Sequence, residues 1–160
     1  MSKLAVYPGS FDPFTLGHLD VAKRTLSLFD RLEVLVVHNP TKTPSFSPEQ
    51  RVEQIRMALA DAGLQNVTVS SLSSGLLANH CTQLGATAIV KGVRNDSDLQ
   101  VELPQARVNR DQSGIETVFL PGDPALSHIS SSLVRQVADL GGEISKYVPS
   151  SVLAAYKAKE

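Results

Sequence analysis

Residues 7–18 form a glycine-bearing loop whose residue types suit phosphate chemistry. The segment reads YPGSFDPFTLGH, follows an apolar run and precedes a helical pattern, which puts His18 at the start of a helix. Amides in the first turn of a helix are unpaired and partly positive, so they bind phosphate, and an imidazole there points toward the same anion. An isolated Gly-His pair would favour a simple turn, but a strand, a glycine-bearing loop and a helix in this order match a nucleotide site. The loop therefore predicts phosphate chemistry centred on His18.

The two glycines of this loop limit the class of cofactor. Gly9 and Gly17 let backbone approach a ligand closely, while Ser10 and Thr15 supply hydroxyl donors. The G-x-G-x-x-G pattern of dinucleotide-binding proteins is absent from the loop. A dinucleotide cofactor is therefore disfavoured.

Three further segments carry groups that can bind anions. Lys91 and Arg94 stand at the end of a predicted strand, where cations are better placed for phosphate than average surface charges, although a solvated basic turn is the alternative. The serine run 130–132 precedes a helix. These serines can cap that helix or offer hydroxyls and amides to phosphate oxygens. Lys42 lies on a proline-bounded loop, where a lysine is ordinarily inert.

Length and composition bound the protein's class. The chain of 160 residues fits one domain, and its 15 basic and 16 acidic side chains give a net charge of −1, so no global positive field favours nucleic acid. No apolar stretch reaches the ~20 residues of a membrane span or resembles a signal peptide, so we expect a cytoplasmic protein without a membrane partner. Cys81 is the only cysteine, which excludes an intrachain disulfide and predicts a buried, inert thiol.

The apolar pattern predicts the elements that position these groups. Short β-branched runs alternate with helical segments, which is typical of a parallel sheet covered by helices. We expect strands at residues 3–7, 31–38, 66–70, 87–91 and 115–120, and helices at 17–29, 48–62, 75–84, 97–111, 130–140 and 150–158. Ser47 begins a capping box, Gly63 and Gly85 suit the positions just past helix ends, and Pro104 should bend its helix. The predicted fold is α/β with a Rossmann-like, doubly wound, five-stranded parallel sheet in a single domain, 1–160.

The first loop also carries a family resemblance. Thr15-Leu16-Gly17-His18 resembles the [H/T]-x-G-H signature of the nucleotidyltransferase superfamily, and residues 7–13 look like its phosphopantetheine adenylyltransferase branch. The resemblance implies a fold of the nucleotidyltransferase type and an enzyme that joins ATP and 4′-phosphopantetheine to give dephospho-coenzyme A and pyrophosphate. It also implies Mg²⁺ that arrives with ATP, no metal cage built by the protein, and a homohexamer.

The resemblance extends to individual positions of this chain. It implies that His18 stabilises the transition state as a donor to the α-phosphate. The implied nucleotide-binding residues are Ser10, Phe11, His18, Gly92, Val93, Arg94, Glu102, Leu126, Ser127, His128, Ile129, Ser130, Ser131 and Ser132. The implied acceptor-binding residues are Ser10, Lys42, Leu77 and Lys91.

The chain departs from the family pattern near the adenosine. Members commonly read R-x-x-x-D-F-E-Y-E where this chain reads RNDSDLQVE over residues 94–102, and several carry an aromatic residue in place of Leu126. Two alternatives therefore stay open. One is a related transferase whose acceptor is nicotinamide mononucleotide or glycerol phosphate, and the other is a non-catalytic nucleotide sensor.

Overall fold

Five parallel strands form the sheet in the computed structural model, which describes residues 1–160. Their order across the sheet is β3-β2-β1-β4-β5. The strands are β1 Leu4–Gly9, β2 Arg31–Val37, β3 Val67–Leu72, β4 Ala88–Val93 and β5 Glu116–Pro121. The sheet confirms the predicted Rossmann-like class. Because the chain leaves β1 toward β2 on one side and later returns to β4 on the other, the carboxyl ends of β1 and β4 border the crevice where such sheets bind ligands.

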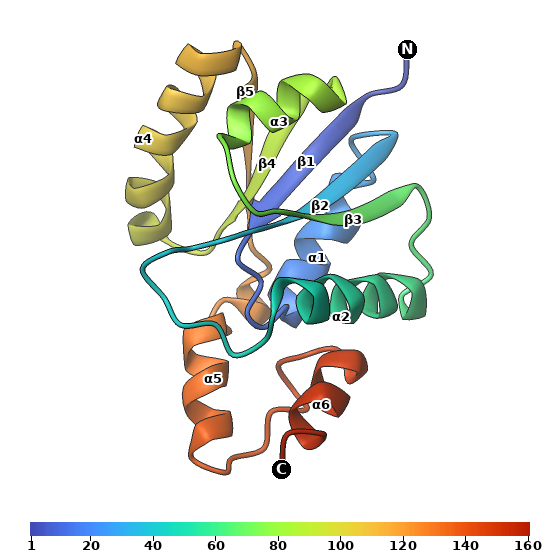
Figure 1. The fold of residues 1–160 in the computed structure, drawn as a ribbon, viewed down its shortest axis with the longest axis vertical. Helices are drawn as coiled ribbons and strands as arrows, with labels where there is room; N and C mark the ends of the chain where they lie inside the picture. The colour runs from blue at the N-terminus through green and yellow to red at the C-terminus, as the bar shows by residue number, and fades with distance from the viewer.

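Helices cover both faces of this sheet (Figure 1). They are α1 Leu16–Thr25, α2 Pro48–Asp61, α3 Leu77–Leu84, α4 Asp96–Ser113, α5 Ser131–Asp139 and α6 Ser150–Lys157, with a short 3₁₀ helix at Pro124–Leu126. Every predicted strand and helix is present, but four strands end one or two residues later than expected, α1 ends at Thr25, and the 3₁₀ helix was not predicted. None of the helices has the length and apolar character needed to cross a bilayer.

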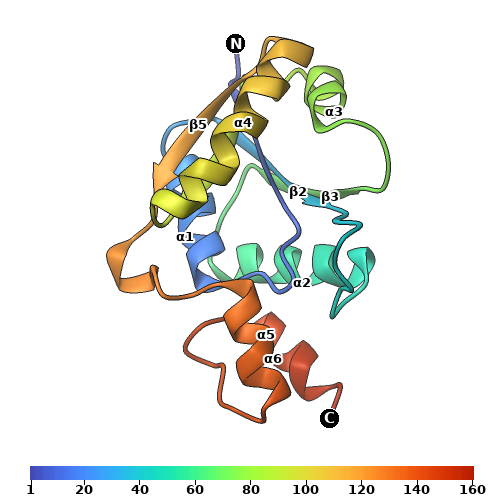
Figure 2. The same ribbon diagram turned by 90° about the vertical axis from the view of Figure 1, so that its left-hand side faces the viewer.

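Alternating residues of β1 divide the core into two parts. Ala5 and Tyr7 belong to the larger cluster, which lies against α1 and α2, while Val6 joins Leu35 and Cys81 in a smaller cluster on the α3 face. Figure 2 shows the sheet between α1 and α2 on one side and α3 and α4 on the other. Burial raises the pKa of the Cys81 thiol to about 11, which agrees with the expected inert thiol.

Local signals set several helix ends as predicted. The Ser47 side chain accepts from the amide of Gln50 and the Gln50 side chain accepts from the amide of Ser47, which completes the capping box of α2. Gly85 ends α3 with a φ of 67°, the left-handed conformation that glycine adopts without steric cost. α4 continues through Pro104 as one helix from Asp96 to Ser113, so the proline does not end it.

Candidate active site

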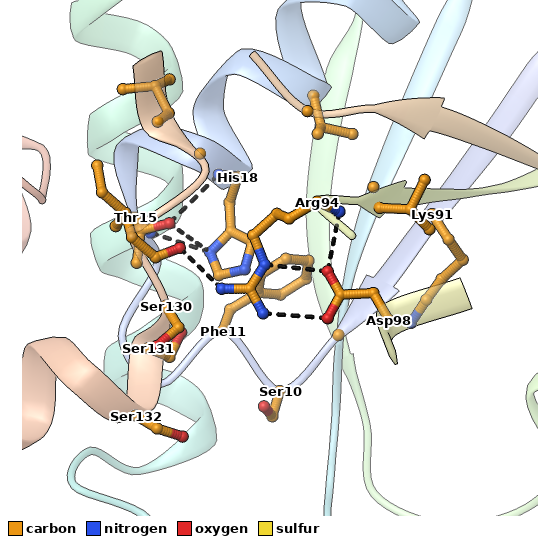
Figure 3. Close-up of a pocket in the computed structure, with 18 of the residues that line it drawn as sticks. Ser10, Phe11, Thr15, His18, Lys91, Arg94, Asp98, Ser130, Ser131 and Ser132 are labelled. Atoms are coloured by element: carbon orange, nitrogen blue, oxygen red, sulfur yellow. Dashed lines mark hydrogen bonds and ion pairs between the residues drawn. The ribbon is translucent and has the colours of Figure 1, made fainter. Parts of the chain in front are cut away.

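A cavity of about 390 Å³ opens beyond the carboxyl ends of β1 and β4. The loop after β1, the first turn of α1, the end of β4, the start of α4 and the segment before α5 all contribute to its wall (Figure 3). It brings together these predicted residues: Ser10, Phe11, His18, Lys42, Lys91, Gly92, Val93, Arg94, Glu102, Leu126, Ser127, Ile129, Ser130, Ser131 and Ser132. Segments more than 100 residues apart in the chain therefore converge on one site.

A second cavity of about 490 Å³ adjoins the first and holds Leu77. Ser10, Lys42, Lys91 and Glu102 line both cavities, so the two spaces meet along these residues. A site for two substrates, one in each cavity, fits this arrangement.

His128 lies outside both cavities. Its side chain is exposed, and its ring is 6.1 Å from the ring of Tyr147 in an edge-on contact. The cavity therefore does not bring His128 together with the other predicted nucleotide-binding residues, and its nucleotide contact stays a prediction.

A capping box at the start of α1 orients the His18 ring. The Thr15 side chain accepts from the amide of His18 at 3.3 Å, and the Thr15 amide donates to His18 Nδ1 at 3.0 Å. A nitrogen that accepts from an amide carries no proton, so the neutral ring carries its proton on Nε2. The Thr15 hydroxyl, expected from the sequence to serve a ligand, caps the helix instead.

Aromatic rings and two cations surround this imidazole. The ring centres of Phe11 and Phe14 lie 5.0 and 5.6 Å from that of His18. Burial, followed by the charges of Arg94 and Lys91, lowers the pKa of His18 to about 3. His18 is therefore uncharged at neutral pH, and its Nε2–H can donate a hydrogen bond without bringing a positive charge.

Arg94 ties the end of β4 to the segment before α5. Its Nη1 donates to the carbonyl of Ile129 at 3.0 Å, while Nε and Nη2 donate to the carboxylate of Asp98 at 3.0 and 3.2 Å. Burial alone would raise the pKa of Asp98, but the hydrogen bonds to Arg94 and the charge of Arg94 lower this pKa below its ordinary value. These bonds hold the guanidinium at the cavity wall, and its remaining N–H groups are free to donate to an anion.

Lys91 pairs with Glu102 where the two cavities meet. The Nζ to Oε1 distance is 3.1 Å, and both side chains are about four-fifths buried. Lys91 thus reaches either space, and its charge is partly balanced in the absence of an anion.

The serine run confirms the cap and adds two tertiary contacts. Ser130 caps α5 by accepting from the amide of Leu133 at 3.1 Å. The Ser131 hydroxyl donates to the carbonyl of Pro13 at 2.7 Å, and the Ser132 hydroxyl accepts from Arg135 at 3.3 Å. The amides of Ser131 and Ser132 make no hydrogen bond within the protein, so the first turn of α5 presents free donors to the cavity.

Sequence reasoning missed several residues of the cavity wall. Asp98, Val101 and Arg135 line it. The spacing of Arg94 and Asp98, four residues apart at a helix start, could have indicated their pairing. Val101, whose side chain lacks a charge or a hydrogen-bonding group, offered no such signal. No group of three or more His, Cys, Asp or Glu side chains is arranged to hold a metal ion.

Gly92 allows β4 to approach α1 closely beside the site. A Cβ atom at this position would lie 2.8 Å from Cγ2 of Val21, closer than non-bonded carbon atoms approach. The glycine between Lys91 and Arg94 therefore serves the packing of α1, which carries His18, against the strand that carries the cations.

Comparisons with known proteins agree with this geometry. A family model described as cytidylyltransferase-like matches residues 6–137. A phosphopantetheine adenylyltransferase from Clavibacter michiganensis is 54% identical over 97% of this chain and 96% of its own, and one from Leifsonia xyli is 51% identical over 95% and 96%.

Solved structures share the fold at low sequence identity. A bifunctional NMN adenylyltransferase/ADP ribose pyrophosphatase from Francisella tularensis superposes with a TM-score of 0.72 at 18% identity, over 94% of this chain and 46% of that one. A putative nicotinate-nucleotide adenylyltransferase from Vibrio parahaemolyticus has a TM-score of 0.65 at 21% identity, over 98% and 99%. These structures share the fold, and the sequence relatives and the family model show that the chain belongs to the phosphopantetheine adenylyltransferase family of cytidylyltransferase-like nucleotidyltransferases.

Proposed function

We propose that this protein transfers the adenylyl group of ATP to 4′-phosphopantetheine, which yields dephospho-coenzyme A and pyrophosphate. The observation that carries the proposal is a cavity in which an uncharged His18 shares one wall with Lys91, Arg94 and the first turn of α5. Such a set of donors suits a reacting phosphate. The relatives that span nearly the whole chain are named for this reaction, which supports the choice of acceptor.

ATP occupies the first cavity in this proposal. The triphosphate lies against the free amides of α5 and the guanidinium of Arg94, and it enters as its magnesium complex. The proposed nucleotide contacts are Ser10, Phe11, His18, Gly92, Val93, Arg94, Glu102, Leu126, Ser127, Ile129, Ser130, Ser131 and Ser132. Val101, a residue that is 62% exposed, and Leu126 offer the adenine aliphatic contacts in place of aromatic ones.

The acceptor occupies the second cavity, with its phosphate at the junction. Ser10, Lys42 and Lys91 line both spaces and contact that phosphate, while Leu77 lines the part that holds the organic arm. Binding of the phosphate gives Lys91 a second anionic partner besides Glu102.

The reaction requires alignment and charge stabilisation more than proton transfer. An oxygen of the acceptor's phosphate, already anionic near neutral pH, attacks the α-phosphorus of ATP, and the bond from that phosphorus to the pyrophosphate oxygen breaks. Lys42, Lys91 and Arg94 offset the repulsion between the two anionic groups. His18 Nε2–H donates to an α-phosphate oxygen, whose charge grows in the transition state, so the donor contributes most when the barrier is crossed.

Pyrophosphate release tests the acceptor and the role of His18 together. We expect release with ATP and phosphopantetheine but not with nicotinamide mononucleotide or glycerol phosphate. His18→Ala should reduce turnover by a factor on the order of 10²–10³, as for other lost transition-state donors. Gln50→Ala is the matched control, because it removes the equivalent capping-box bond from α2, away from both cavities.

Three results would contradict the proposal. Release only with another phosphorylated acceptor would point to a related transferase. Nucleotide binding without release for any acceptor would point to a sensor. Near-normal turnover in His18→Ala would remove the histidine from the mechanism.

The family resemblance also supports a proposal for assembly and location. We propose a homohexamer in the cytoplasm. Light scattering of the purified protein tests the assembly, and fractionation of the source cells tests the location.

A further inference from the structure

Arg51 of α2 is a buried cation that contacts the loop after β1. Only 2% of the residue is exposed, and it lines neither of the two substrate cavities. Its Nη1 donates to the carbonyl of Ser10 at 2.6 Å, and its Nε donates to the carbonyl of Phe46 at 3.1 Å. One guanidinium therefore bridges the loop after β1 and the loop that follows Lys42.

Asp12 joins the same two loops from the opposite side. Its carboxylate accepts from the amide of Ser45 at 2.8 Å and from that of Phe46 at 3.2 Å. Asp12 belongs to the loop after β1, whereas Ser45 and Phe46 belong to the loop of Lys42. Arg51 and Asp12 thus connect the two loops with four hydrogen bonds to backbone groups.

The burial of this arginine costs free energy, which its hydrogen bonds and the nearby carboxylates must offset. Removing a guanidinium from water carries a free-energy penalty, and burial lowers the pKa of Arg51, although the charges of Asp12 and Glu49 act in the opposite direction. Arg56 on the same helix donates to the carbonyl of Val69 at 3.0 Å with most of its side chain in solvent. A contact from α2 to backbone therefore does not need a buried cation.

The two bridged loops each contribute one residue to the junction of the cavities. Ser10 and Lys42 line both cavities and come from the two bridged loops. The amide of Phe11 donates to no acceptor in the protein and shares a peptide plane with the Ser10 carbonyl, so fixing that carbonyl also fixes the direction in which this free donor points.

We propose that Arg51 is a positioning residue that holds Ser10 and Lys42 at the spacing required by the acceptor's phosphate. This inference rests on the proposed function. Ser10 is also a proposed nucleotide contact, but most of the nucleotide site is held by other hydrogen bonds, because Arg94 donates to the carbonyl of Ile129 and Ser131 donates to the carbonyl of Pro13. Loss of Arg51 therefore affects the acceptor more than ATP.

Steady-state kinetics of Arg51→Lys and Arg51→Met test the inference, together with titration of a non-hydrolysable ATP analogue. Lysine keeps the charge but cannot bridge two carbonyls with a rigid fork. We expect the KM for phosphopantetheine to rise about tenfold or more in both variants, the size expected for one lost charge-assisted hydrogen bond. The Kd of the ATP analogue should stay within about twofold by the same reasoning. Arg56→Met is the matched control and should leave both constants unchanged.

The outcomes separate this inference from the proposed function. Wild-type turnover with phosphopantetheine is measured first, and its absence contradicts the proposed function. If the wild type is active, an unchanged acceptor KM in Arg51→Lys overturns the inference, as does an equal loss of ATP-analogue affinity. If neither arginine variant folds, Asp12→Asn decides, because it weakens the bridge from the other side while keeping the shape of the side chain. It must then show the same acceptor-selective rise in KM.

Discussion

Acidification from pH 7 to pH 5 should leave the His18 ring uncharged in the ligand-free protein. With a pKa of about 3, roughly one ring in a hundred is protonated at pH 5, whereas at the ordinary pKa of ~6.5 about 97% would be. Desolvation is the largest cause of the lowered pKa, and the charges of Arg94 and Lys91 add to it. Protonation would also remove the lone pair on Nδ1 that accepts from the amide of Thr15.

Removal of one neighbouring cation tests the order of these causes. Arg94→Met should raise the pKa of His18, because a repelling charge is lost, yet leave it below ~6.5, because the ring stays buried. In the folded wild type the ring binds its proton only near pH 3, while the unfolded chain binds it near ~6.5. Unfolding therefore takes up a proton between these values, so the free energy of unfolding falls as the pH falls through this window. His18→Gln should make that decrease shallower.

Nuclear magnetic resonance of ¹⁵N-labelled imidazoles is the direct assay. His18→Gln identifies the signal, which should show a proton on Nε2, none on Nδ1, and no titration between pH 5 and 8. Melting curves of the wild type and His18→Gln over the same range measure the dependence of stability on pH. A His18 signal that titrates near the ordinary value, or one with its proton on Nδ1, would refute the reasoning about its burial and capping box.

Two other substitutions test the packing of Gly92 and the pairing of Arg94 with Asp98 beside the site. Gly92→Ala should lower the free energy of unfolding by roughly 1–3 kcal/mol in a denaturant titration, because the added Cβ meets Val21 at 2.8 Å; an unchanged midpoint would contradict this close approach. Asp98→Asn should weaken ATP-analogue binding about tenfold in calorimetry, because Arg94 loses the negative charge and one of the two acceptor oxygens that hold it, and keeps its bond to the carbonyl of Ile129. Unchanged affinity would mean that Asp98 does not position Arg94.

Local patterns in the chain were sufficient to predict the elements and much of the site. β-branched runs predicted the five strands, and the Ser47 capping box predicted the start of α2, because both depend on neighbours a few residues away. The motif around His18 indicated phosphate chemistry for the same reason, since a strand, a loop and a helix start are consecutive in sequence. Element ends were less accurate: α1 stops at Thr25, four residues before the predicted end, after which the chain turns into β2.

Contacts between distant segments were beyond such patterns. The sheet order β3-β2-β1-β4-β5 joins different strands, and the bonds from Arg94 to the carbonyl of Ile129 and from Arg51 to the carbonyl of Ser10 join residues that lie 35 or more positions apart. The low pKa of His18 likewise depends on rings and cations that only the folded chain gathers around it. Residue types and local spacing indicate which groups can bind phosphate. Tertiary packing decides which of them share a cavity. The reason is that desolvation and the interactions between charges depend on distances in space and not on separation along the chain.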